Sequence, residues 1–193
     1  MIGRRKLAFW QAGLLFLLAC AGVAQPGVAR AEPPRQLATG EMANFTFLKA
    51  PQAAPAVSFV DGEGKELTLA AFQGKVLLLN FWATWCAPCR KEMKELDDLQ
   101  KQLGGPKFAV LAISADRQGP GVIGDFFNEV GIRHLAKYND GSMKTHRAFK
   151  SLGLPTTVLL DHNGMEVGRL VGPAAWNAKE ALALVRHYVE AAK

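Results

Sequence analysis

Two almost uninterrupted hydrophobic runs lie in the middle of the chain, at residues 76–82 and 108–114. Runs of this length are typical of strands that are covered on both faces. Between them, apolar side chains recur at the spacing of one helix face: Met93, Leu96, Leu99 and Leu103. The glycines and proline at 104–106 are a strong helix stop. The pattern therefore predicts a buried strand, a helix over 87–103 and a second buried strand.

The rest of the chain alternates between strand and helix patterns in the same way. Period-two alternation around a turn at 61–64 predicts a hairpin of 57–60 with 65–69. The further predicted elements are a helix over 119–130, a short strand over 134–138, a helix over 142–152, strands over 156–161 and 166–170, and a last helix opened by a capping box at 177–180. This order predicts an α/β sandwich with a mixed sheet.

The first 31 residues differ from the remainder in composition. They hold basic residues but no acidic one, and residues 7–24 are almost wholly apolar. A basic start, an apolar core and small residues before Glu32 predict a signal peptide cleaved after Ala31. Two alternatives stay open: lipid attachment at Cys20, and an uncleaved membrane anchor. Residues 32–51, rich in Ala, Pro and Gln, are interpreted as a linker, and 52–193 as the folded domain.

Net charge gives no indication of a nucleic-acid partner. The whole chain carries +6, whereas residues 32–193 carry 19 basic and 17 acidic side chains, which leaves +2. The excess of basic residues therefore comes mostly from the predicted signal peptide, and no nucleic-acid binding is expected. The domain is expected to be a monomer.

The candidate chemistry is a Cys-x-x-Cys pair, Cys86 and Cys89, where the first strand leads into the helix. Residues three apart at a helix start are neighbours, about 5 Å between Cα atoms, which suits a disulfide. Free N–H groups and the positive dipole end favour a thiolate at Cys86. Pro88 suits the first helical turn. A structural disulfide, half a metal site and two inert thiols are the alternatives; no second Cys or His pair at short spacing supports a metal.

Residues 80–92, which read NFWATWCAPCRKE, resemble the active-site stretch of the TlpA/ResA-type thiol:disulfide oxidoreductases. The likeness extends over roughly residues 52–192 and includes GLPTTVLLD at 153–161 and GPAAW at 172–176, the latter closest to rhizobial-type TlpA proteins. It implies a thioredoxin fold with an N-terminal β-hairpin and a central helix-strand insert. It implies no cofactor and no bound metal.

The resemblance also implies roles for single residues. Cys86 would attack a substrate disulfide and Cys89 would resolve the mixed disulfide. Pro155 would be a cis-proline facing the pair, Glu92 a carboxylate that exchanges protons with it, and Trp85, Pro88 and Leu154 would contact substrate. Without the resemblance, Pro155 is a strand-leading trans-proline and Glu92 a surface helix residue. Trp82, His146 and His162 are interpreted as ordinary structural or surface residues.

The function implied is reduction of disulfides in partner proteins outside the cytoplasm, in the periplasm or on the outer face of the cytoplasmic membrane. Expected partners are apocytochrome c or copper-assembly proteins of cytochrome oxidase, with a membrane thiol reductant as electron donor. The alternatives are a general disulfide oxidant, a Cu(I) metallochaperone that binds through the two cysteines, and a thiol peroxidase.

Overall fold

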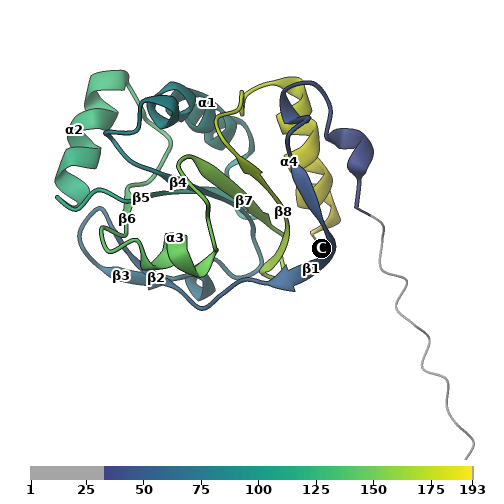
Figure 1. Ribbon diagram of the computed structural model, residues 1–193, viewed down its shortest axis with the longest axis horizontal. Helices are drawn as coiled ribbons and strands as arrows, with labels where there is room; N and C mark the ends of the chain where they lie inside the picture. Colours follow the sequence, from purple (N-terminus) through teal and green to yellow (C-terminus); the bar gives the residue numbers. More distant parts are fainter. Residues whose placement is uncertain (1–32, 193) are drawn as a thin grey trace, which may run out of the picture. The chain divides into compact units, whose positions relative to one another are not determined.

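The computed structural model describes residues 33–192 of the 193-residue chain. Its centre is an eight-stranded sheet with the order β1-β8-β7-β4-β5-β6-β2-β3 (Figure 1). The strands are β1 (Thr46–Ala53), β2 (Ser58–Asp61), β3 (Glu66–Thr68), β4 (Val76–Trp82), β5 (Phe108–Ser114), β6 (Tyr138–Asn139), β7 (Thr156–Leu160) and β8 (Met165–Val171). Strands β4, β5 and β6 run parallel, and the other pairs are antiparallel. The predicted mixed sheet is confirmed.

Helices lie on both faces of this sheet (Figure 1). They are α1 (Ala87–Leu103), α2 (Pro120–Val130), α3 (Lys144–Ala148) and α4 (Lys179–Ala191), with short 3-10 helices at Arg35–Leu37, Gly40–Met42 and Leu69–Phe72. Apolar side chains of α1, α2 and α4 pack in one core cluster, whereas the second cluster contains Phe149 at the end of α3.

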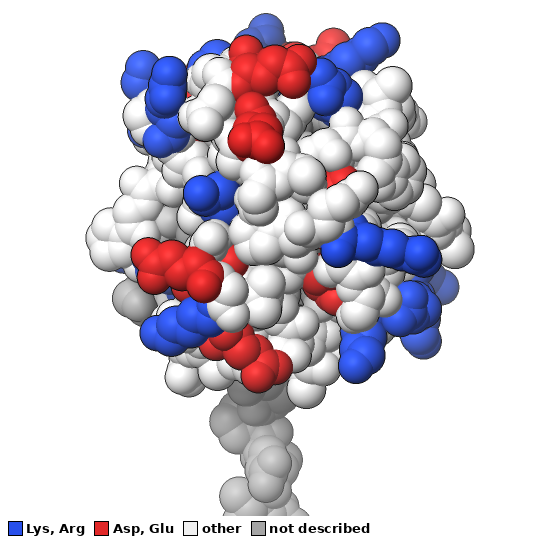
Figure 2. All heavy atoms as spheres, turned by 90° about the vertical axis from the view of Figure 1, so that its left-hand side faces the viewer, with Lys and Arg blue, Asp and Glu red and all other residues white. Residues whose placement is uncertain are grey.

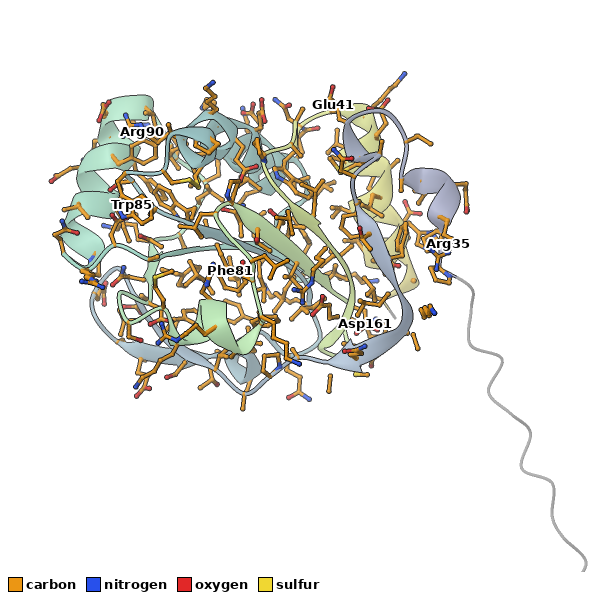
Figure 3. All side chains as sticks on the ribbon, in the orientation of Figure 1. Arg35, Glu41, Phe81, Trp85, Arg90 and Asp161 are labelled. Carbon is orange, nitrogen blue, oxygen red and sulfur yellow. A yellow bond between two sulfur atoms is a disulfide. The ribbon has the colours of Figure 1, made fainter. Side chains whose placement is uncertain are left out.

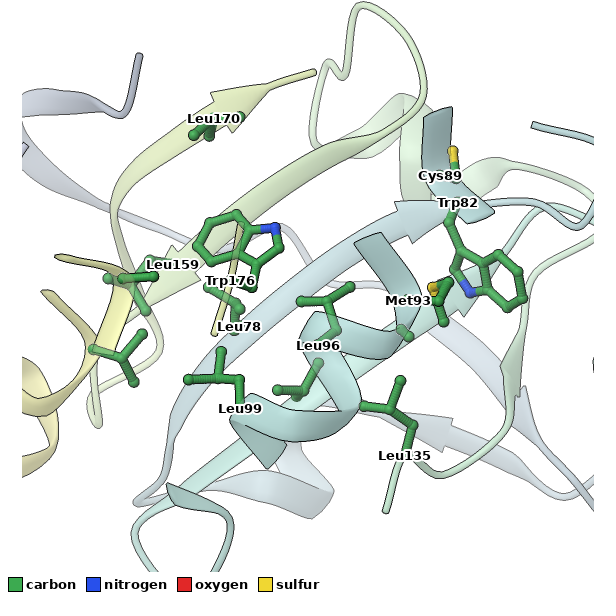
Figure 4. Packing of buried hydrophobic residues seen from close by; sticks show 14 of the residues in the cluster. Leu78, Trp82, Cys89, Met93, Leu96, Leu99, Leu135, Leu159, Leu170 and Trp176 are labelled. Atoms are coloured by element: carbon green, nitrogen blue, oxygen red, sulfur yellow. The ribbon is translucent and has the colours of Figure 1, made fainter. Parts of the chain in front are cut away.

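Strand β4 divides its side chains between the two clusters. Leu78 and Trp82 belong to the cluster beneath α1, and Leu79 and Phe81 to the other. This alternation is the period-two geometry of a strand, and it places Asn80 on the α1 side. Figure 4 shows the α1 side, where Leu96 and Leu99 of the helix lie near Leu78 and Trp176.

Two predicted elements differ in extent. The helix expected over 142–152 covers only Lys144–Ala148, and Met143 and Lys150 on either side have positive φ angles of 57° and 51°. The strand expected over 134–138 begins only at Tyr138. The backbone N–H groups of His134 and Leu135 donate to the buried carboxylate of Asp97 instead of to a neighbouring strand.

The predicted capping box at 177–180 is wrong. Ala178 is the residue that precedes α4, and no side chain caps the helix there. The Asn177 side chain instead donates to the Asp98 carboxylate of α1, over 3.2 Å. The helix buries Ala181, Leu184 and Val185.

The predicted linker over 32–51 is also wrong from Thr46 onward. Residues 46–53 form β1, which pairs with β8 at one edge of the sheet. Phe45 and Phe47 are buried, and Phe47 pairs with Gly168, where the side chain of any other residue would collide with Phe45. A stretch rich in alanine, proline and glutamine is thus held in place by two aromatic side chains.

The predicted signal or anchor, including Cys20, lies outside the described residues, and no helix within 33–192 is long and apolar enough to cross a membrane.

Candidate active site

The two cysteines form a disulfide at the start of α1. Their sulfur atoms are 2.04 Å apart and their Cα atoms 5.3 Å. Cys86 immediately precedes the helix, and its sulfur accepts the backbone N–H of Cys89 over 3.3 Å. Cys86 is 6% exposed and Cys89 is fully buried. An incoming sulfur atom would therefore reach Cys86 first.

The loop between β4 and Cys86 is fixed by Asp116. Its carboxylate accepts the backbone N–H of Thr84 over 2.9 Å and the Thr84 hydroxyl over 2.7 Å. The Ser114 hydroxyl donates to the same carboxylate over 2.6 Å. Sequence reasoning missed Asp116, although a signal existed. It follows β5, which is the parallel neighbour of β4, so the ends of both strands meet at one edge.

Aromatic side chains surround the disulfide in two different settings. Trp82 is fully buried and packs on Phe126 and Phe127 of α2, with ring centroids 5.3 and 5.9 Å away. Trp85, by contrast, is 66% exposed beside Cys86. Figure 3 shows Trp85 and Arg90 on the side of the molecule where α2 lies. The interpretation of Trp82 as a structural residue is confirmed, and Trp85 is free to contact another molecule.

Glu92 is a buried carboxylate one helical turn beyond Cys89. Only 1% of it is exposed, so the alternative of a surface helix residue is excluded. One carboxylate oxygen accepts the Asn80 amide N–H over 2.8 Å; the other accepts the backbone N–H of Ala174 over 3.1 Å and the indole N–H of Trp176 over 3.2 Å. Burial raises the pKa of Glu92 to about 7, although the three hydrogen bonds oppose this rise.

Two of these partners were missed as site residues. Asn80 is the polar residue within the otherwise apolar β4, which was a readable signal because an isolated amide in a buried strand needs a partner. Trp176 was noted only as part of the resemblance at 172–176. Its contact with Glu92 spans 84 positions in the sequence and could not be read from local spacing.

The Leu154–Pro155 peptide bond is cis, as the resemblance implied. Pro155 is buried and immediately precedes β7, where Thr156 pairs with Phe81 of β4. Its carbonyl accepts the N–H of Gly172 over 2.9 Å. Pro155 therefore lies at the edge of the sheet from which the Cys86 loop leaves β4, and Leu154 is half-buried beside it.

The two histidines weighed earlier lie apart from each other. His146 is half-buried against Phe81, with ring centroids 5.8 Å apart, and burial lowers its pKa. His162 lines a hollow of about 830 Å³. Leu77, near the beginning of β4, also lines this hollow, which therefore lies at the opposite end of the strand from the disulfide. Within residues 33–192, no three His, Cys, Asp or Glu side chains form a group that could hold a metal ion.

Exposed apolar side chains gather at the edge of the sheet near the disulfide. Among residues 33–192, the large exposed hydrophobic side chains are Trp85, Leu152 and Val171. Val171 pairs with Thr156, and Thr156 pairs with Phe81, so Val171 lies at the end of the sheet where β4 leads into the loop that carries Trp85. Leu152 lies four residues before Thr156 in the chain. Pro88 is exposed beside them. The face of the molecule in Figure 2 carries charged side chains of both signs with uncharged areas between them.

Comparison with known proteins identifies similar chains. The Redoxin family matches residues 49–184. The thiol-disulfide oxidoreductase ResA of Bacillus thuringiensis is 33% identical over 119 residues, which cover 62% of this chain and 68% of the relative. The thioredoxin-like protein YneN of Bacillus subtilis is 33% identical over 124 residues, covering 59% of this chain and 66% of that protein.

Solved structures have the same fold. A thiol-disulfide oxidoreductase from Bacteroides fragilis superposes with a TM-score of 0.57 and 30% identity, over 68% of this chain and 95% of that one. A thiol:disulfide interchange protein of the thioredoxin family from Chlorobium tepidum gives 0.58 and 27%, over 72% and 97%. The predicted thioredoxin-type fold is confirmed.

Proposed function

The chain belongs to the Redoxin family, as a thiol:disulfide oxidoreductase of the TlpA/ResA type, and from this membership we propose that it reduces disulfides in partner proteins outside the cytoplasm. The observation that carries the proposal is the arrangement at the start of α1. Cys86, at 6% exposed, is the more accessible of the two cysteines, Cys89 is fully buried behind it, and a buried carboxylate with a pKa of about 7 follows one turn later.

The first step begins with both cysteines reduced, and Cys86 is the attacking residue. Its thiolate, favoured by the free N–H groups at the helix start, attacks one sulfur of the partner's disulfide. A Cys86–partner disulfide forms, and the partner's other sulfur leaves as a thiolate that takes a proton from water. Trp85, Pro88 and Leu154 contact the partner around this bond, and Pro155 presents its backbone beside it. Trp85 and Pro88 are exposed enough for such contacts.

The second step uses Cys89. Its sulfur attacks Cys86, the Cys86–partner bond breaks, and the partner's second sulfur leaves as a thiolate. Cys89 must lose its proton for this attack, and Glu92 accepts it. A carboxylate with a pKa of about 7 can both take and return a proton near neutral pH, which an ordinary glutamate with a pKa of 4.5 does poorly.

The finer assignments rest on the resemblance noted in the sequence. It favours a reductant that acts on apocytochrome c or on copper-assembly proteins, with the rhizobial-type likeness at 172–176 favouring the copper route. A membrane thiol reductant would restore the dithiol. The basic and apolar residues 1–31 support a location in the periplasm or on the outer face of the cytoplasmic membrane.

The reduction potential tests the direction of electron flow. The purified domain is equilibrated with defined thiol/disulfide buffers, and the fraction of the Cys86–Cys89 disulfide is followed by thiol labelling. We expect a potential near that of thioredoxin, about −270 mV, or lower. A potential near about −120 mV would make the protein an oxidant and overturn the proposal. A Cys86→Ser variant should lose disulfide exchange, whereas Cys89→Ser should accumulate the mixed disulfide.

A further inference from the structure

A small hollow opens next to the buried carboxylate of Glu92. It measures about 240 Å³, lies between α1 and the segment that follows β8, and is lined by Lys91, Glu92, Glu95, Pro173, Ala174 and Ala175. Glu92 is otherwise covered, since only 1% of it is exposed. The hollow is therefore a route by which a proton on Glu92 can reach solvent.

Glu95 lies one helical turn beyond Glu92 on the side of this hollow. It is half-buried, and burial raises its pKa. Both carboxylates are bound by the same backbone segment, because Ala174 N–H donates to Glu92 and Trp176 N–H donates to Glu95. Residues three apart on a helix have Cβ atoms about 5–6 Å apart, so the two acids influence each other.

The charges around the pair are mostly negative. Glu41 in the 3-10 helix Gly40–Met42 and Asp98 of α1 both raise the pKa of Glu95, and Glu95 in turn raises that of Glu92. Lys91, which lines the hollow, is exposed to solvent and its charge is screened. The segment 173–176 contributes only uncharged groups.

We propose that Glu95 is a positioning residue that controls the proton on Glu92: its charge disfavours ionisation of Glu92, and its carboxylate receives the proton at the mouth of the hollow. This rests on the proposed function, in which Glu92 accepts the proton of Cys89. Each turnover then moves one proton from Cys89 to Glu92, from Glu92 through the hollow to Glu95, and from Glu95 to water, while the partner's thiolates take protons from solvent.

The test replaces Glu95 with glutamine in the full chain. The amide keeps an oxygen that can accept the Trp176 N–H, so the variant removes the charge and the proton acceptor with little change in shape. The titration of Glu92 is followed by carboxyl ¹³C NMR, with its resonance assigned from its absence in Glu92→Gln. We expect the acid ionisation constant of Glu92 to increase at least about threefold. The pH profile of insulin-disulfide reduction should move to lower pH by the corresponding amount, about 0.5 pH unit.

Asp98→Asn is the matched control. It removes another acidic charge of the same helix from a residue that does not line the hollow, so the titration of Glu92 should move much less. Equal changes in both variants, or no change in Glu95→Gln, would overturn the proposal, because a merely structural role of Glu95 would alter stability and not the pH profile. If Glu92→Gln itself leaves the pH profile unchanged, the role of Glu92 in the proposed function fails instead.

Discussion

Helix α1 carries two acidic side chains, Glu92 and Asp97, that are equally buried, at 1% exposed each, but are surrounded very differently. Asp97 accepts three backbone N–H groups on a single oxygen, from Arg133, His134 and Leu135, over 2.6 to 3.1 Å. Lys94 lies 3.7 Å from its other oxygen. Asp97 thus has a nearby positive charge and consecutive donors from one loop.

Glu92 has neither. Its three donors are neutral and come from separate places: the side chain of Asn80 in β4, and the backbone of Ala174 and the indole of Trp176 after β8. Its charged neighbour, Glu95, is repulsive. The difference teaches that burial alone does not determine how an acid behaves. A carboxylate with a positive neighbour and a row of N–H groups serves as an anchor, whereas one held by scattered neutral donors can titrate near neutral pH.

The largest effect is expected from removing the anchor. Asp97→Ala removes the shared acceptor of three backbone N–H groups, of which that of Leu135 is buried, and should lower the free energy of unfolding by about 4 kcal/mol. Asp97→Asn keeps the accepting oxygen and should cost about half as much. Urea unfolding at pH 7 measures both. The folded fraction should keep the wild-type pH profile of disulfide exchange; a displaced profile would show that Asp97 belongs to the active site and would break the comparison.

Replacing Glu92 should mainly change how the free energy of unfolding depends on pH. The folded protein holds the Glu92 proton up to a pKa of about 7, whereas the unfolded chain releases it near 4.5. Between these values the folded state binds more protons, so the free energy of unfolding falls as pH rises, by about 3 kcal/mol in total.

Glu92→Gln has no proton to lose and should remove this fall. Relative to wild type, the variant should therefore gain about 3 kcal/mol between pH 4 and pH 8.5, measured by urea unfolding across that range. Glu95→Gln keeps the Glu92 carboxylate and should retain most of the slope. Parallel pH curves for wild type and Glu92→Gln would contradict the assigned ionisation.

The sequence was sufficient for the elements that carry a strong local pattern. The apolar run at 76–82 and the helical spacing after Cys89 predicted β4 and α1 without any long-range information. The spacing of the two cysteines showed that a disulfide between them was geometrically possible. Local patterns failed where distant contacts decide. The row of donors to Asp97 replaced a predicted strand, Asn177 turned to Asp98 instead of capping α4, and β1 was hidden in a composition typical of linkers.

The contrast between the two acids was also beyond the sequence. Glu92 and Asp97 both lie on the buried side of one amphipathic helix, and their hydrogen-bond donors are between 12 and 84 positions away. Only the resemblance singled out Glu92. The isolated Asn80 in β4 was the one local signal, because a buried amide needs a polar partner, and Glu92 is that partner.

Removing the amide of Asn80 should make Glu92 harder to ionise. This hydrogen bond opposes the rise in the pKa of Glu92 more than the other two do. Asn80→Ala should therefore lower the acid ionisation constant of Glu92 about tenfold, corresponding to about 1.4 kcal/mol. Carboxyl ¹³C NMR measures it. Thr157→Val, which removes the other acceptor of the same amide at 2.9 Å, should have a smaller effect. An unchanged titration in Asn80→Ala would mean that the bond contributes nothing to the charge of Glu92.

The smallest effect is expected at Trp176. Its indole N–H opposes the rise in the pKa of Glu92 less than Asn80 or Ala174 does. Trp176→Phe keeps a buried aromatic ring and removes this donor, so the ionisation constant of Glu92 should fall about twofold to threefold, as for the loss of a long neutral hydrogen bond. The smaller ring also leaves a cavity and lowers stability, which is why titration, not unfolding, is the informative measurement. A change as large as that in Asn80→Ala would show that the indole contributes as much as Asn80 to the ionisation of this acid.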